Sequence, residues 1–224
     1  MIEINGLNHG ILNIDEAIIP EGITAVAGRN GSGKSTLLKL VSGLKIPDSG
    51  SIHIDGKNPR KLDTGYVSEY PDDNSIFGMV YDEIASSLRF KHAGCDETDR
   101  RVTEISSLFE ISHLLKREIR TLSGGEKVMV ALASACADRP DLLVIDEPDS
   151  HLDRESAEIF FESVLNTGSE HIIICTHNME TVSKADNMIF LESGRIKFQG
   201  TPEEIFANFL KKTCFYPPLW RFKK

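Results

Sequence analysis

Apolar residues along this chain recur with two different periods, and the change of period separates strands from helices. Runs of apolar or β-branched residues at strand length fill the first third and return after residue 140. Between residues 80 and 117 the apolar positions recur at helical spacing instead, with a break at Ala93-Gly94. This order predicts one α/β domain over residues 1–224, with a mostly parallel sheet, an antiparallel β-layer and a helical subdomain inserted at about residues 76–138.

Local signals place the individual elements. Asn5-Gly6 and His9-Gly10 are predicted to turn the chain between its first two strands. The tail from Phe215 onward is aromatic and basic, and its pattern predicts no element. The expected strands lie at 2–4, 11–19, 23–27, 51–54, 66–67, 142–145, 171–176, 189–191 and 195–198, and the expected helices lie at 36–42, 80–117 with its break, 128–136, 154–165 and 202–210.

Length, charge and cysteine content narrow the classes of protein. The 224 residues suit one well-buried domain, and a net charge of −9 argues against a nonspecific nucleic-acid or anionic-membrane surface. The four cysteines form no CxxC pair, so buried free thiols in a reducing compartment are expected. The apolar stretches are far shorter than the roughly 18 residues of a membrane span. We expect a cytoplasmic chain, and any membrane span to belong to another subunit.

A glycine-rich loop between a strand and a helix is the first candidate site. The stretch GRNGSGKS follows the apolar strand at 23–27 and precedes a helical pattern, so its backbone N–H groups and the helix dipole are expected to meet at a phosphate. Lys34 is expected to reach the β- and γ-phosphates, and the Ser35 hydroxyl is expected to bind Mg²⁺. The predicted nucleotide-binding residues here are Gly28, Asn30, Gly31, Ser32, Gly33, Lys34, Ser35 and Thr36.

Two carboxylates follow the apolar strand at 142–145. Asp146 and Glu147 are delivered to the carboxyl edge of the sheet, where the glycine-rich loop also lies. Asp146 is predicted to hold Mg²⁺ through its water shell, and Glu147 is predicted to orient and deprotonate an attacking water. An apolar strand ending in Asp-Glu is a weak signal alone, and its place after a phosphate loop strengthens it.

A second phosphate-binding pattern occurs at Leu122-Ser-Gly-Gly-Glu126. Ser123 is expected to cap a helix whose first N–H groups stay exposed at Gly124 and Gly125, although a capped surface helix is the plainer interpretation. The order and spacing of GRNGSGKS, LSGGE, LLVIDEP, SHLD and ICTH make the chain similar to the ATP-binding cassette (ABC) ATPases, with a P-loop NTPase (RecA-like) fold.

The resemblance implies a partner and further site residues. It implies a head-to-tail dimer with a second copy or a paralogue, in which ATP bound to one phosphate loop is covered by Ser123, Gly124 and Gly125 of the other subunit. His177 matches the family's switch histidine at the γ-phosphate, and Asp153 matches the loop that crosses the dimer interface. ATP and Mg²⁺ are the implied ligands, and ATP hydrolysis is the implied reaction.

Within the family, residues 65–73 and 80–84 are similar to those of energy-coupling-factor and cobalt/nickel-type importers. That resemblance implies a membrane-spanning transporter subunit docked on the helical subdomain around residues 76–92. The cassette itself is then expected to be peripheral on the inner face of the cell membrane.

Two positions depart from the family pattern. The family's loop glutamine is replaced by Glu69, which is predicted either to weaken phosphate binding or to ligate Mg²⁺ directly. Beside the triphosphate, at about 4 Å and an effective dielectric near 20, the added charge costs on the order of 4 kcal/mol unless a metal screens it. His9 is the one plausible ring for the family's adenine-stacking aromatic residue.

Two other functions stay open on sequence alone. A soluble cassette acting on DNA or ribosomes is disfavoured, because only 87 residues separate Ser35 from Ser123 and basic linkers are absent. A non-hydrolysing nucleotide-binding module is disfavoured by the intact Lys34 and Glu147, although Glu69 keeps it open.

Overall fold

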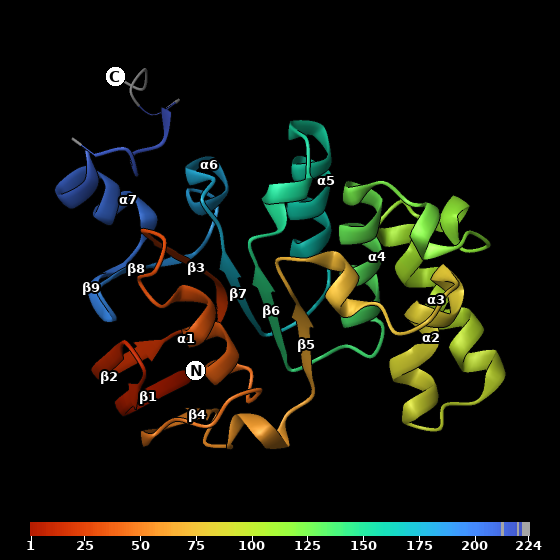
Figure 1. The fold of residues 1–224 in the computed structure, drawn as a ribbon, viewed down its shortest axis with the longest axis horizontal. Helices are drawn as coiled ribbons and strands as arrows, with labels where there is room; N and C mark the ends of the chain where they lie inside the picture. The colour runs from red at the N-terminus through yellow and green to blue at the C-terminus, as the bar shows by residue number, and fades with distance from the viewer. Residues whose placement is uncertain (212, 219, 221–224) are drawn as a thin grey trace. The chain divides into compact units, whose positions relative to one another are not determined.

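The fold is described from a computed structural model, which defines residues 1–211, 213–218 and 220. The chain divides into two compact units. The first unit comprises Met1–Leu62, Val144–Glu147 and Glu170–Lys224, and the second comprises Asp63–Leu143 and Pro148–Ser169. Figure 1 shows the elements of each unit along the chain.

An antiparallel sheet forms one layer of the first unit. Its order is β2-β1-β4, with β1 (Ile2–His9), β2 (Leu12–Ile19) and β4 (Ser49–Ile54). The predicted turn at Asn5-Gly6 is wrong, because β1 continues through it and only Gly10-Ile11 turns the chain. Gly6 has a φ of 57°, and the pairing of β1 with β4 shifts register between Asn5 and Asn8. The glycine therefore forms a bulge inside the strand.

A mostly parallel sheet forms the other layer of the first unit. Its strands run in the order β7-β3-β8-β9, and β3 is parallel to both of its neighbours while β9 is antiparallel to β8. The last residues of β6, Val144–Glu147, also belong to this unit. The bounds are β3 (Gly22–Gly28), β6 (Leu142–Asp146), β7 (His171–Cys175), β8 (Asn187–Glu192) and β9 (Arg195–Gly200).

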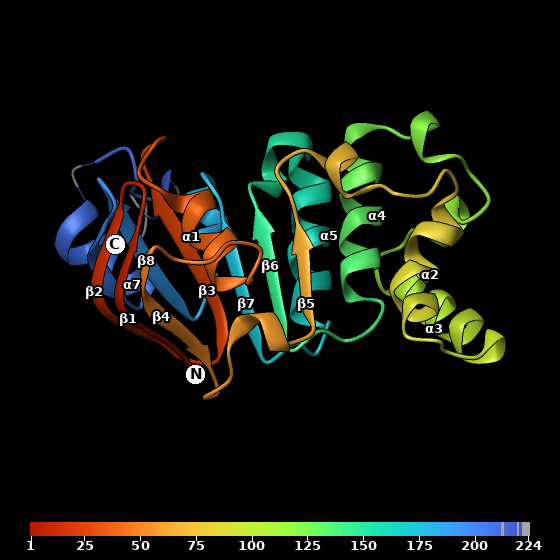
Figure 2. The same cartoon turned by 60° about the horizontal axis from the view of Figure 1, so that its bottom comes forward.

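Helices of the first unit follow the strands. Figure 2 shows α1 beside β3, with β1, β2 and β4 on its other side. The expected helix at 202–210 divides into one α-helical turn and a π-helical turn. The bounds are α1 (Lys34–Val41), α6 (Met179–Val182), α7 (Pro202–Ile205), the π-helix η6 (Phe206–Leu210) and the 3₁₀ turn η1 (Pro59–Lys61).

The second unit is mostly helical. Helices α2 and α3 are separated at the predicted break, and α2 packs on both α3 and α4. The unit extends beyond the expected helical subdomain, because it also includes β5 and α5. The bounds are α2 (Val80–Phe90), α3 (Cys95–Leu108), α4 (Gly124–Cys136), α5 (Arg154–Leu165), β5 (Thr64–Val67), and the 3₁₀ turns η2 (Pro71–Asn74), η3 (Ser112–Leu114), η4 (Ile119–Thr121) and η5 (Pro148–His151).

The carboxyl ends of three strands in the first unit hold the candidate site residues. Strand β3 runs into the glycine-rich loop, β6 ends at Asp146, and β7 is followed by Thr176 and His177. These strands are buried along almost their whole length, as their apolar sequences predict. The predicted α/β fold with an antiparallel layer and inserted helices is confirmed.

Candidate nucleotide site

The glycine-rich loop leads directly into α1. Gly33, with a φ of 103°, is the N-cap of that helix, so the helix begins at Lys34 rather than at the predicted residue 36. The space beside Gly31 is open, since a Cβ there would have no neighbour within 4 Å. The buried Ser32 hydroxyl has no hydrogen-bond partner in the described part of the chain. An open loop at a helix N-terminus fits a phosphate group.

Lys34 lies almost fully buried inside this loop, with 5% of its surface exposed. Its Nζ is 3.2 Å from the Gly28 carbonyl and 3.5 Å from that of Arg29. A buried ammonium needs such partners, because desolvation of a charge is costly. The loop thus holds a fixed positive charge at its centre.

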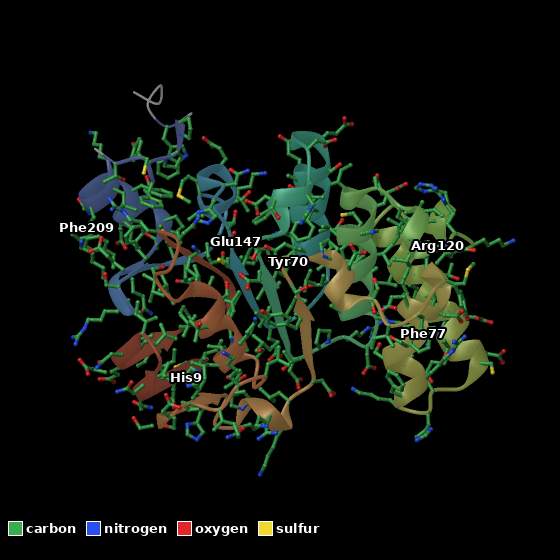
Figure 3. The ribbon with its side chains drawn as sticks, viewed as in Figure 1. His9, Tyr70, Phe77, Arg120, Glu147 and Phe209 are labelled. Atoms are coloured by element: carbon green, nitrogen blue, oxygen red, sulfur yellow. The ribbon has the colours of Figure 1, made fainter. Side chains whose placement is uncertain are left out.

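Glu147 completes a charged cluster with Lys34. Glu147 Oε1 lies 3.4 Å from Lys34 Nζ and 3.0 Å from His177 Nε2, and the two nitrogens are 3.4 Å apart. Glu147 has a φ of 49°, a strained value for a residue with a side chain, and its N–H donates to the Cys175 carbonyl at 2.9 Å. Figure 3 shows the side chain among the first-unit strands. The predicted catalytic residues Lys34, Glu147 and His177 are therefore brought together.

Asp146 and Ser35 form the second polar pair of the site. The Ser35 hydroxyl donates to Asp146 Oδ1 at 3.2 Å, and the carboxylate is buried, with 3% of its surface exposed. A buried carboxylate beside a hydroxyl offers two hard oxygen ligands, the type that Mg²⁺ prefers. These residues fit the predicted metal.

Cys175 is a neighbour of the site that the sequence pattern identified only as a buried thiol. Its Sγ lies 3.8 Å from Glu147 Oε1, in position to donate a weak hydrogen bond. Burial raises the pKa of the Cys175 thiol, and the nearby Asp146 carboxylate raises it further. The thiol therefore stays protonated and is a donor at neutral pH. The available signal was the position of Cys175 at the end of an apolar strand, two residues before His177.

His9 ends β1 in the first unit (Figure 3). Its Nδ1 lies 3.2 Å from Asp48 Oδ1, at an angle that makes no hydrogen bond. The side chain is 23% exposed, so one part of the ring is open to solvent. The role of His9 beside adenine stays a prediction.

The second unit carries the other predicted phosphate-binding residues. Ser123 is the N-cap of α4, and it exchanges hydrogen bonds with Glu126 in both directions, at 3.3 Å and 2.7 Å. The bond from the Ser123 backbone N–H holds the pKa of Glu126 below its ordinary value. Gly124 is exposed at the start of the helix. The predicted cap is present, and the helix end is open to a ligand.

A hollow of about 460 Å³ adjoins this helix end within the second unit. It is lined in part by Ser123, Gly124, His151 and Asp153. Asp153 is itself the N-cap of α5, and the Ser156 backbone N–H holds its pKa below the ordinary value. Glu69, half-buried after β5, belongs to the same unit, and its part in metal binding stays a prediction.

A glycine loop with a buried lysine, a buried Asp and a paired Glu at the carboxyl ends of parallel strands define a nucleotide-hydrolysing P-loop protein. The family model described as "ABC transporter" matches residues 11–150. The chain belongs to the ABC transporter family and corresponds to the ATP-binding ATPase cassette of such transporters.

Three relatives illustrate the match. The chain is 36% identical over 197 residues to the molybdate/tungstate import ATP-binding protein WtpC of Pyrococcus abyssi, covering 82% of this chain and 56% of that protein. It is 33% identical over 193 residues to the energy-coupling factor transporter ATP-binding protein EcfA1 of Enterococcus faecalis, covering 82% and 69%. The solved structure of CbiO1 from Clostridium perfringens, described as part of the ABC transporter complex CbiONQ, superposes with a TM-score of 0.84 at 28% identity, covering 92% and 90%.

The chain thus spans little more than half of the Pyrococcus protein. No helix among the described residues is long and apolar enough to cross a membrane.

Proposed function

We propose that this chain is the ATP-hydrolysing subunit of an importer, driving a membrane-spanning subunit that is a separate chain. The observation that carries the proposal is the convergence of Lys34, Glu147 and His177 within 3.4 Å of one another at the phosphate loop. WtpC is named as an import protein and EcfA1 as an energy-coupling factor transporter protein, which supports this function over a soluble cassette acting on DNA or ribosomes.

Cassettes of this family dimerise and work with membrane subunits. For this chain we extend that to a head-to-tail pair, formed with a second copy or a paralogue. ATP held by one phosphate loop is then covered by Ser123, Gly124 and Gly125 of the partner cassette. The exposure of Ser123 and Gly124 at the start of α4 supports this role, because the first N–H groups of a helix have no partner within the helix backbone.

The proposed hydrolysis mechanism is based on the contacts of the Glu147 carboxylate. Its carboxylate lies 3.4 Å from Lys34 Nζ and 3.0 Å from His177 Nε2. When Lys34 binds the β- and γ-phosphates instead, Glu147 is released to accept a proton from water. The water oxygen then bonds to the γ-phosphorus, the bond from that phosphorus to the bridging oxygen breaks, and ADP leaves. His177 stays beside the carboxylate and orients it toward the γ-phosphate.

Ser35 and Asp146 are the residues that would hold Mg²⁺. A divalent cation bound there neutralises phosphate charge. We propose Glu69 as an additional ligand of that ion, because a carboxylate replaces the amide that the family pattern has at this position.

The Glu69 proposal has a direct test. We expect Glu69→Gln to shift the Mg²⁺ concentration for half-maximal ATPase activity by at least threefold. Glu180→Gln, a carboxylate of the first unit outside the proposed site, serves as the control and should leave the titration unchanged. An unaltered ATPase rate and Mg²⁺ dependence in Glu69→Gln contradicts the assignment.

The membrane subunit is proposed to dock on the helical part of the second unit. There Ile76 and Phe90 are 73% and 66% exposed, and the Phe77 and Phe90 rings are 6.4 Å apart. Phe77 and Arg120 line a hollow of about 380 Å³, and both are labelled in Figure 3. Exposed apolar side chains rimmed by polar residues are typical of a protein interface.

Purification from native membranes tests the importer function. We expect a membrane-spanning subunit to co-purify with the wild-type chain, and Phe90→Asp to lose it. Phe209→Asp is the matched control, since Phe209 is 54% exposed on the first unit. Ribosomes or DNA in place of a membrane subunit contradict the proposal, and equal retention by both variants contradicts the docking surface.

A further inference from the structure

The turn between β8 and β9 touches the phosphate loop through one glycine. The Gly194 N–H donates to the Ser32 carbonyl at 3.0 Å, and the Gly194 carbonyl accepts from the Asn13 N–H at 2.9 Å. Gly194 therefore ties the phosphate loop to the start of β2. All three segments belong to the first unit.

Glycine is required at this position by space as well as by conformation. Gly194 has a φ of 78°, and a Cβ there would lie 1.8 Å from the Ile11 carbonyl oxygen and 2.6 Å from its carbon. These are backbone atoms, which cannot rotate away as a side chain can. A hairpin turn alone needs only the positive φ, so the close approach to Ile11 calls for another explanation.

The same two segments touch the phosphate loop at other points. A Cβ at Gly28 would lie 2.2 Å from the Leu191 carbonyl oxygen in β8. A Cβ at Gly33 would lie 2.7 Å from the Leu12 side chain. The loop is thus held at its start by β8, at its end by Leu12, and between them by Gly194.

We propose that the Ser193-Gly194 turn is a brace that holds the phosphate loop in its nucleotide-binding shape, and that Gly194 is a positioning residue for ATP. The loop binds phosphate through backbone N–H groups, whose directions depend on the torsion angles of the loop. By fixing the Ser32 carbonyl, Gly194 orients the neighbouring peptides before the nucleotide arrives, which lowers the cost of ordering them on binding.

The segment that Gly194 contacts also lies close along the chain to the proposed adenine neighbour. Ile11, which Gly194 contacts, lies two residues after His9, the proposed adenine neighbour. The inference rests on the proposed nucleotide site and adds to it a role for a turn that touches no ligand itself.

Gly56 provides a matched control in the same unit. Asp55 and Gly56 have φ values of 49° and 74°, close to the 50° and 78° of Ser193 and Gly194. A Cβ at Gly56 would have no neighbour within 4 Å. Alanine at either position brings the same backbone strain, so only Gly194→Ala also disturbs the brace.

Titration calorimetry with ADP compares the two variants. We expect Gly194→Ala to bind ADP at least tenfold more weakly than the wild type, and Gly56→Ala to bind within twofold. The KM for ATP should rise by a similar factor in Gly194→Ala, with kcat at saturating ATP within about threefold, because the brace acts before binding. Equal affinity of folded Gly194→Ala and wild type overturns the brace, as does an equal loss in Gly56→Ala.

Hydrogen exchange on the wild-type protein decides the question if Gly194→Ala does not fold. ADP should slow exchange at the Gly194 and Asn13 amides together with the phosphate loop, while the Lys57 amide, bonded to Ile54 within its own turn, should not change. Slowing in the loop without slowing at Gly194 overturns the brace. A wild-type chain that binds no ADP contradicts the proposed function instead.

Discussion

Glu147 is the residue on which the proposed chemistry depends. Its carboxylate lies within 3.4 Å of both Lys34 and His177, and the Cys175 thiol lies beside the same oxygen. These contacts hold the carboxylate in one orientation at the phosphate loop. The contacts therefore support the proposed role of Glu147 as the base, which its position after an apolar strand also predicts.

Substitution of Glu147 tests that role. We expect Glu147→Gln to lower kcat by roughly 10² to 10⁴, because the amide cannot accept the proton of the attacking water. Nucleotide affinity should be retained, since Lys34 and the loop N–H groups are unchanged. A phosphate-release assay at saturating ATP measures the rate, and hydrolysis at the wild-type rate would show that another group is the base.

For individual residues, the sequence predicted which residues belong to the site better than it predicted their contacts. The glycine loop, Asp146 and Glu147 were found because their spacing and flanking strands are local signals. The contact of Cys175 with Glu147 and that of Gly194 with Ser32 were not found. They join residues 28 and 162 positions apart, and no local pattern carries such pairings.

Among the elements, helix α4 has residues at its N-terminus that both stabilise the helix and belong to the proposed phosphate site. Ser123 caps the helix and is also a proposed phosphate contact, while Glu126 returns a hydrogen bond to the Ser123 N–H. The pKa of Glu126 is lowered in the folded chain. Its contribution to stability is therefore complete above the ordinary carboxyl pKa of 4.5 and is lost as the pH falls through the lowered value.

Glu126→Gln tests this pH dependence. The variant should be less stable than the wild type by about 0.3 to 1 kcal/mol at pH 7, because it loses a negative charge at a helix N-terminus. The difference should shrink as the pH falls below 4.5. Urea unfolding followed by circular dichroism at several pH values measures it, and a gap that grows in acid would contradict the capping account.

Element boundaries were predicted where a cap or breaker marked them. Helix α5 begins at Arg154 as expected, because Asp153 caps it. Strand β1 was cut short, because Asn5-Gly6 is a turn signal that also suits a bulge. Helix α1 begins earlier than its apolar pattern indicates, since Gly33 caps it through backbone geometry alone.

For the whole molecule, burial separates the four cysteines into two pairs. Cys95 and Cys214 are exposed, whereas Cys136 and Cys175 are buried, as their apolar sequence contexts predict. Burial raises the pKa of Cys136 to about 12, and it raises that of Cys175 as well. Thiolate is the reactive form, so the buried pair is expected to be inert.

Alkylation counts the two classes directly. With iodoacetamide at pH 8, mass spectrometry should find rapid modification of Cys95 and Cys214 only. Cys136 and Cys175 should react after unfolding in urea. Rapid modification of Cys175 in the native chain would contradict the enclosed position given to it beside Glu147.

The central claim is that each chain carries halves of two ATP sites, so that ATP joins two cassettes. The phosphate loop and Glu147 lie in the first unit and the Ser123 helix end lies in the second. The sequence predicted the motifs, and in the proposed dimer they act together only when a second subunit is present.

Light scattering of Glu147→Gln with and without ATP tests this claim most directly. We expect monomer without nucleotide and a stable dimer with ATP, because the bound nucleotide joins the two subunits and is not cleaved. Adding Ser123→Arg to this variant should abolish the dimer, since it blocks the covering helix end. If the partner cassette is a paralogue, the same experiment is done with a mixture of this chain and the paralogue that co-purifies with it. A chain that binds ATP yet stays monomeric both alone and with its co-purified paralogue would contradict the account.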